Sequence, residues 1–190
     1  MRISTIYAIM LVFCWTVFVA LPEVGSAPSK MSTTSMGHDR FLKLRKRLSR
    51  SVSSNWKECS WNSINENKDY GLIKDCVFLK KYSNSALHVY WNSEFSVNQC
   101  SGCCKRWFFT FNGAECQSPR AIDGLVYLSY GTFWLHRVRH IEGHCNNVHK
   151  GHVRVGFNVG DCSGYGNANA YTGWNTVSRL FVEEVTRPQP

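Results

Sequence analysis

Short stretches in which hydrophobic and polar residues alternate run from about residue 56 to residue 185, and residues typical of turns separate them. Alternation with a period of two is typical of β-strands that bury one face, and no stretch keeps a helical period over twelve residues. Many short strands between glycine-rich turns favour an antiparallel sandwich or barrel. The expected strands cover residues 72–82, 86–91, 105–111, 125–130, 132–141, 152–159 and 177–185.

The most hydrophobic of these stretches is the aromatic run at residues 107–111. Successive side chains of a strand point to opposite faces, so Trp107, Phe109 and Phe111 are expected to share one buried face. The Asn-Gly dipeptide that follows is a strong signal for a tight turn, and the chain is expected to reverse there. Cysteines flank this strand on both sides, so it is interpreted as a core strand that is stapled at its ends.

The N-terminal 26 residues have the pattern of a secretory signal peptide. A short positive start precedes an almost entirely apolar run over residues 6–21, and small residues follow at 24–27. A membrane anchor is the alternative, but the run is shorter than the roughly 20 residues that a span needs. We therefore expect residues 1–26 to be removed and the mature protein to be secreted to the extracellular space or matrix, without a transmembrane segment.

Removal of the signal peptide leaves eight of the nine cysteines. An even number of cysteines in an oxidising compartment favours a disulfide framework, whose connectivity the sequence does not determine. A zinc site is the alternative for the CxxC motif at residues 100–103, but no second CxxC or HxxxH pair accompanies it. We expect disulfides, and no metal or cofactor. The cysteines concerned are Cys59, Cys76, Cys100, Cys103, Cys104, Cys116, Cys145 and Cys162.

Residues 27–55 differ in composition from the rest and are expected to form a disordered basic linker or a pro-segment. The first fifty residues contain eight Lys/Arg and two Asp/Glu, whereas residues 51–190 contain fourteen and eleven. Most of the net charge of +9 therefore lies in this leader. The remaining chain is only mildly basic, and we expect no nucleic-acid partner.

The basic run at residues 40–50 has three interpretations that remain open. Arg47 and Arg50 form an R-x-x-R pattern that secretory convertases read, so the leader is a candidate for processing. Its leucines and interleaved cations also suit a short amphipathic helix at a heparan-type polyanion or a membrane surface. The third interpretation is a solvated tether.

Histidines recur every fourth residue at His136, His140 and His144. On a strand these residues and Glu142 would share a face, which makes a metal site or a pH-responsive patch geometrically possible. Gly143 suggests that the strand ends there and that His144 is diverted. Ordinary half-exposed strand histidines are therefore the favoured interpretation.

The composition of residues 164–173 predicts a loop. Tyr165, Tyr171 and the following Trp174 form a candidate binding surface, because exposed aromatic residues on loops often contact partners. The alternative, which the sequence favours for the two tyrosines, is that they cover an open end of the sandwich.

Sequence motifs for catalysis are absent: there is no nucleophile elbow, phosphate-binding loop or dinucleotide-binding fingerprint. A nucleophile pair of Cys145 and His149 is conceivable, but the even set of cysteines favours a disulfide instead. Glu183 and Glu184 alternate on a strand and face opposite sides, which is unsuitable for a catalytic carboxylate pair. We therefore expect no enzyme activity.

Four stretches resemble the C-terminal domain of the collagen triple-helix repeat-containing proteins. They lie at residues 71–78, 82–92, 103–116 and 172–179, of which the third reads CCKRWFFTFNGAEC and the fourth TGWNTVSR. The resemblance implies a jelly-roll-like β-sandwich over residues 56–186, similar to the trimeric C1q heads. It also implies a secreted, non-enzymatic homotrimer that modulates Wnt and Frizzled signalling, cell migration or matrix deposition.

The sequence departs from this family ahead of the domain. The family carries a short Gly-X-Y segment there, whereas residues 28–55 contain only Gly37. A collagen triple helix requires glycine at every third position, so a trimer would rest on the folded domain alone. The alternative function is a lectin-like or heparin-binding extracellular module that uses the basic leader or the tyrosine loop.

Overall fold

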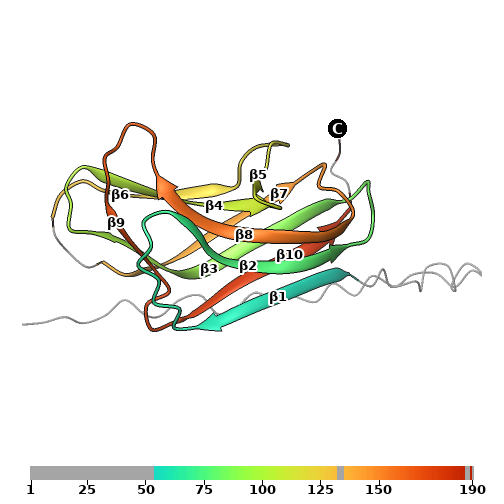
Figure 1. Ribbon diagram of the computed structural model, residues 1–190, viewed down its shortest axis with the longest axis horizontal. Coiled ribbons are helices and arrows are strands. Elements are labelled where there is room, and N and C mark those ends of the chain that lie inside the picture. Colours follow the sequence, from blue (N-terminus) through green and yellow to red (C-terminus); the bar gives the residue numbers. More distant parts are fainter. Residues whose placement is uncertain (1–53, 132–134, 187–188, 190) are drawn as a thin grey trace, which may run out of the picture. The chain divides into compact units, whose positions relative to one another are not determined.

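The computed structural model describes residues 54–131, 135–186 and 189, and these form two antiparallel five-stranded sheets packed as a sandwich (Figure 1). Sheet A contains β1 (Asn55–Asn62), β10 (Val177–Val185), β3 (Ala86–Asn98) and β7 (Arg137–Cys145) in this order, with β9 (Asn169–Thr172) paired to the end of β3. Sheet B contains β2 (Gly71–Lys80), β8 (Gly151–Asp161), β4 (Cys103–Phe111) and β5 (Ala114–Glu115) in this order, with β6 (Asp123–Leu128) paired to β4. The expected all-β sandwich is confirmed.

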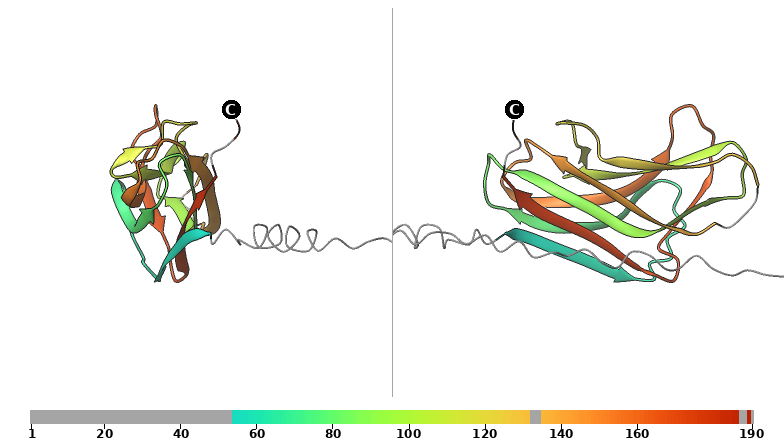
Figure 2. Two further views of the ribbon diagram at one scale, coloured as in Figure 1. Left: turned by 90° about the vertical axis from the view of Figure 1, so that its right-hand side faces the viewer. Right: turned by 180° about the vertical axis from the view of Figure 1, so that it is seen from behind.

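The core lies between the two sheets, which Figure 2 shows end-on and from behind. Trp107 on β4 is fully buried and stacks on Phe95 of β3 at a centroid distance of 4.6 Å. Trp91 of β3 stacks in the same way on Phe157 of β8, at 4.1 Å. Large aromatic rings that alternate along each strand therefore fill the space between the sheets, because every second side chain points inward.

The turn after β4 has the geometry that its sequence predicts. Asn112 and Gly113 both have positive φ, 53° and 91°, which a two-residue hairpin turn of the favoured type requires. Phe111 pairs with Ala114 across this turn. The chain reverses there, as expected.

Each of the seven expected strands has a counterpart, but only β10 has the expected bounds, and three further strands appear. The expected strand 86–91 continues to Asn98. The sequence does not predict this extension, because the polar residues Ser93, Glu94 and Ser96 interrupt the hydrophobic alternation although they are buried. The expected strand 132–141 is displaced, since β7 begins at Arg137 and ends at Cys145. The unpredicted strands are β1, the two-residue β5, and β9, which lies in the segment assigned to a loop.

Four disulfides staple the sandwich. Cys59–Cys76 joins β1 of sheet A to β2 of sheet B, and Cys116–Cys145 joins the segment directly after β5 to β7 of sheet A. Cys104–Cys162 and Cys100–Cys103 lie at the start of β4. β4 is therefore held covalently near both ends, as the sequence suggests.

Several expectations concern residues outside the described part of the chain. The signal peptide at 1–26, most of the leader at 27–55 and the candidate processing residues Arg47 and Arg50 belong to this group. Among the residues that the structure describes, no helix has the length and hydrophobicity that a membrane span requires.

Candidate functional site

A row of rings crosses the outer face of sheet A. It comprises Trp56 on β1, Phe181 on β10, Tyr90 on β3 and His140 on β7, and we call it the aromatic row. The ring centroids of Trp56 and Phe181 lie 5.5 Å apart, those of Phe181 and Tyr90 4.8 Å, and those of Tyr90 and His140 5.2 Å. Four strands that are distant in sequence thus build one continuous surface feature.

The rings of the aromatic row face one another. The planes of Trp56 and Phe181 differ by 22°, and those of Phe181 and Tyr90 by 14°. Both pairs are therefore stacked, and the rings partly cover one another. Aromatic residues are enriched at interfaces between proteins, so the row suits contact with the side chains of another protein.

Histidines and a carboxylate adjoin the aromatic row. His88 on β3 stacks on His144 of β7 at a centroid distance of 4.6 Å. The carboxylate of Glu142 contacts Nε2 of His88 at 2.7 Å and Nε2 of His140 at 2.9 Å. These hydrogen bonds, that to His140 first, lower the pKa of Glu142. Glu142 therefore holds two of the imidazoles on the same face.

The expectation that β7 ends at Gly143 and diverts His144 is wrong. β7 continues to Cys145, and His144 pairs with His88. Close packing explains why glycine occupies position 143, because a Cβ there would lie 2.9 Å from Cγ1 of Ile122. His140, Glu142 and His144 share a face, as the alternation predicts, whereas His136 precedes the strand and lies elsewhere. Within the described part of the chain, no group of three or more His, Cys, Asp or Glu residues is arranged to hold a metal ion.

The three residues of the candidate loop surface, Tyr165, Tyr171 and Trp174, lie in two separate places. His136 lies between Trp174, on which it stacks at 4.5 Å, and Tyr171, whose ring it meets edge-on at 6.1 Å. Glu94 fixes this group, because its carboxylate contacts Nδ1 of His136 at 2.7 Å and accepts a hydrogen bond from the backbone N–H of Trp174 at 2.9 Å. Tyr165 is separate and packs edge-on against Tyr127 of sheet B at 5.5 Å.

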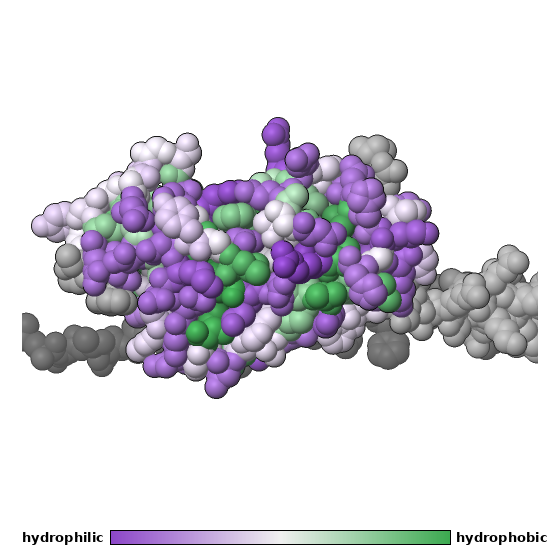
Figure 3. Space-filling model, viewed as in Figure 1, coloured by the Kyte–Doolittle hydropathy of each residue, from purple (hydrophilic) through white to green (hydrophobic). Residues whose placement is uncertain are grey.

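The outer face of sheet B is less suited to docking. Val77 and Leu79 on β2 are about half exposed there. Figure 3 shows that the hydrophobic areas of the face carrying β2 and β8 are separated by hydrophilic residues. Among the residues that the structure describes, the ring contacts of this face form no row across several strands like that of sheet A.

A pocket near the turn after β4 contains the other candidate for chemistry. Cys116, Cys145 and His149 line it. The suggested nucleophile pair of Cys145 and His149 is not available, because Cys145 forms a disulfide with Cys116.

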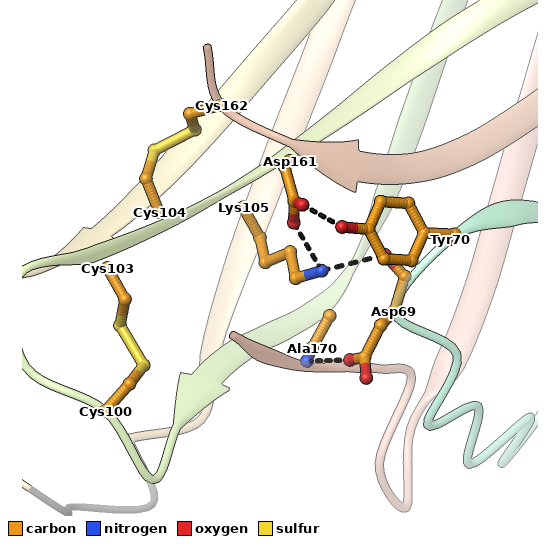
Figure 4. A network of polar contacts seen from close by, with 9 residues as sticks. All are labelled: Asp69, Tyr70, Cys100, Cys103, Cys104, Lys105, Asp161, Cys162 and Ala170. Atoms are coloured by element: carbon orange, nitrogen blue, oxygen red, sulfur yellow. Dashed lines mark hydrogen bonds and ion pairs between the residues drawn. A yellow bond between two sulfur atoms is a disulfide. The ribbon is translucent and has the colours of Figure 1, made fainter. Parts of the chain in front are cut away.

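A buried polar network at one end of the sandwich was not predicted from the sequence (Figure 4). Lys105 of β4 is fully buried, and its Nζ lies 2.7 Å from Oδ1 of Asp161 on β8. Nζ also donates a hydrogen bond to the backbone carbonyl oxygen of Asp69 at 2.9 Å and lies 4.3 Å from the ring centroid of Tyr70. The alternation along β4 is the sequence signal that could have indicated this position, because Lys105 shares the inward face of Trp107.

A protein-family model described as CTHRC1, C-terminal domain, matches residues 51–182. The chain belongs to the CTHRC1 C-terminal domain family. The resemblance to collagen triple-helix repeat-containing proteins is thereby confirmed. The matched residues include all eight disulfide-bonded cysteines, the whole aromatic row and the Lys105 network.

Membership of the CTHRC1 family bears on the function of the chain in two ways. The family is not known for enzymes, and multiple disulfides in a CTHRC1 domain are consistent with secretion. Among its described residues, the CTHRC1 domain carries the aromatic row on the outer face of a sandwich that disulfides cross-link.

Proposed function

We propose that the protein is a secreted, non-enzymatic extracellular signalling or matrix protein that acts through protein–protein contacts. The proposed role is modulation of Wnt- and Frizzled-type signalling, cell migration or matrix deposition, and the proposed assembly is a homotrimer. Membership of the CTHRC1 family supports this role.

The observation that carries the proposal is the aromatic row on sheet A. Trp56 is 55% exposed at one end of the row, and His140 is exposed at the other. Large aromatic side chains contribute much of the binding free energy at protein interfaces when a partner buries them. The salt bridge between Arg179 and Glu58, at 3.1 Å, lies beside the row and provides the polar border that such interfaces have.

Replacement of Trp56 by alanine is expected to weaken binding to a Frizzled or Wnt ectodomain by roughly 10- to 30-fold, the loss that truncation of a large aromatic residue buried by a partner produces. Phe181→Ala is expected to act in the same direction. Surface plasmon resonance with the purified secreted protein measures both effects.

Trp174→Ala is the matched control, because Trp174 is 46% exposed and belongs to the separate loop group around His136. It is expected to leave the affinity unchanged. If Trp174→Ala weakens binding and Trp56→Ala does not, the loop surface of Tyr165, Tyr171 and Trp174 is the interface instead. Absence of binding by the unaltered protein to all Wnt and Frizzled ectodomains tested removes the Wnt assignment.

Binding of a heparan-type polyanion through the leader is a second candidate function. The charge distribution favours it, since eight of the 22 Lys/Arg lie in the first fifty residues with only two Asp/Glu. Deletion of residues 40–50 is expected to abolish salt-dependent retention on heparin, because clustered cations supply the attraction that salt screens. Arg137→Ala with Arg139→Ala, both exposed on β7, serves as the control and should retain binding. The opposite result would place polyanion binding on the folded domain.

A further inference from the structure

Lys105 is placed as a buried nucleophile beside a carboxyl group. Its cross-strand partner on β8 is Asp161, and both side chains point inward at the end of the sandwich (Figure 4). Nζ of Lys105 lies 2.7 Å from Oδ1 of Asp161, yet Oδ1 has no aligned hydrogen-bond donor among the described residues. The contact is therefore close without being a directed hydrogen bond.

The surroundings hold the two groups in place. The backbone carbonyl oxygen of Asp69 accepts a hydrogen bond from Nζ, and the hydroxyl of Tyr70 donates one to Oδ2 of Asp161. The carboxylate of Asp69 turns away and accepts a hydrogen bond from the backbone N–H of Ala170 at 2.8 Å. Tyr70 thus polarises the carboxyl group, while Asp69 orients the amine.

From this geometry we propose that Lys105 and Asp161 condense into an intramolecular isopeptide bond that joins β4 to β8. Nζ of the neutral amine attacks Cγ of the neutral carboxylic acid, the Nζ–Cγ bond forms and the Cγ–Oδ1 bond breaks. Oδ1 leaves as water with a proton from the amine, and Oδ2 remains as the amide oxygen. The step is redox-neutral and needs no cofactor.

The electrostatic environment favours the reactive forms of both groups. Burial lowers the pKa of Lys105, although the negative charge of Asp69 opposes this. Burial raises the pKa of Asp161, and the charge of Asp69 adds to that effect. Both shifts bring the two pKa values closer together, which reduces the cost of passing a proton from the ammonium to the carboxylate to give the amine and the acid that the condensation needs.

A second buried lysine shows which feature distinguishes this pair. Lys80 is 1% exposed, burial lowers its pKa, and the carboxylate of Glu184 is near it. Desolvation acts on Glu184 in the opposite direction, but hydrogen bonds from Ser85, the backbone N–H groups of Lys81 and Tyr82, and Asn55 outweigh it and lower the pKa of Glu184. Glu184 therefore remains an unreactive carboxylate, and no cross-link to Lys80 is expected.

Peptide mapping of the secreted full chain by mass spectrometry, after reduction, alkylation and trypsin digestion, tests the proposal. The expected product is a branched peptide that joins the segments containing Lys105 and Asp161, uncleaved after Lys105 and lighter than their sum by one water molecule. Cleavage after Lys105, with both segments recovered as linear peptides of full mass, overturns the proposal. The peptides that contain Lys80 and Glu184 are the internal control and should be linear.

Variants separate the cross-link from other modifications. Asp161→Ala and Lys105→Arg should both lack the branched peptide, and its persistence in either variant contradicts the assignment. Tyr70→Phe should slow the formation of the cross-link during refolding by about tenfold or more, because it removes the hydroxyl that stabilises charge on Oδ2. If the first two variants do not fold, the map of the unaltered protein decides alone.

Discussion

Trp107→Ala is expected to reduce the free energy of unfolding by about 3–5 kcal/mol, the range for removal of a large buried aromatic side chain. Trp107 is fully buried in the middle of β4, and its ring is nearly parallel to that of Phe95. Its Nε1–H donates a hydrogen bond to Oγ1 of Thr172 at 2.9 Å. The substitution therefore opens a cavity between the sheets and leaves the buried hydroxyl of Thr172 without this donor.

Chemical denaturation at 25 °C, with the disulfides intact, measures this loss. Trp56→Ala is the matched control, because it deletes the same side chain at a position that is 55% exposed. Its cost should be about 1 kcal/mol or less, as for most surface substitutions. Similar losses in the two variants would contradict the assignment of Trp107 to the core.

The parts of the fold that local sequence predicts are those where alternation and turn chemistry agree. β4 is the best example, because Trp107, Phe109 and Phe111 alternate and an Asn-Gly turn follows. The bounds of β10, Val177–Val185, coincide with the expected strand for the same reason. In both strands, one buried face produces a clear period of two.

The strands that were missed depend on partners distant in sequence. β1 is an edge strand of mixed polarity that is recognisable only by its pairing with β10. β9 lies in a segment rich in glycine and asparagine, and it becomes a strand because Ala170 pairs with Val97 at the end of β3. Tertiary pairing overrides composition at both places.

Prediction of the aromatic row from the sequence would have required the pairing register of the strands as well as their positions. Tyr90 and Phe181 are 91 positions apart in the chain, and they stack because β3 and β10 pair these residues directly. Local alternation predicted that His140 and Glu142 share a face, but it gave no information on which aromatic residues would adjoin them. Disulfide connectivity was undetermined for the same reason, since it follows from the sheet arrangement and not from cysteine spacing.

Removal of the Cys104–Cys162 disulfide by alanine substitution of both cysteines is expected to reduce the free energy of unfolding by about 4 kcal/mol, and removal of Cys100–Cys103 by only about 1.5 kcal/mol. The first bridge closes a loop with a sequence separation of 58 and the second one of 3. A bridge that closes a longer loop removes more conformational entropy from the unfolded chain, so the difference follows from loop length.

Denaturation without reductant, with the other three bridges verified by mass spectrometry, measures both double variants under the same conditions. Cys100–Cys103 is the matched control because it lies at the same end of β4 and removes the same number of sulfur atoms. Equal losses, or a larger loss for Cys100–Cys103, would show that native-state packing of these cystines, and not constraint of the unfolded chain, determines their contribution. The expected order instead makes the stability of the sandwich depend on covalent links between segments that are distant in sequence.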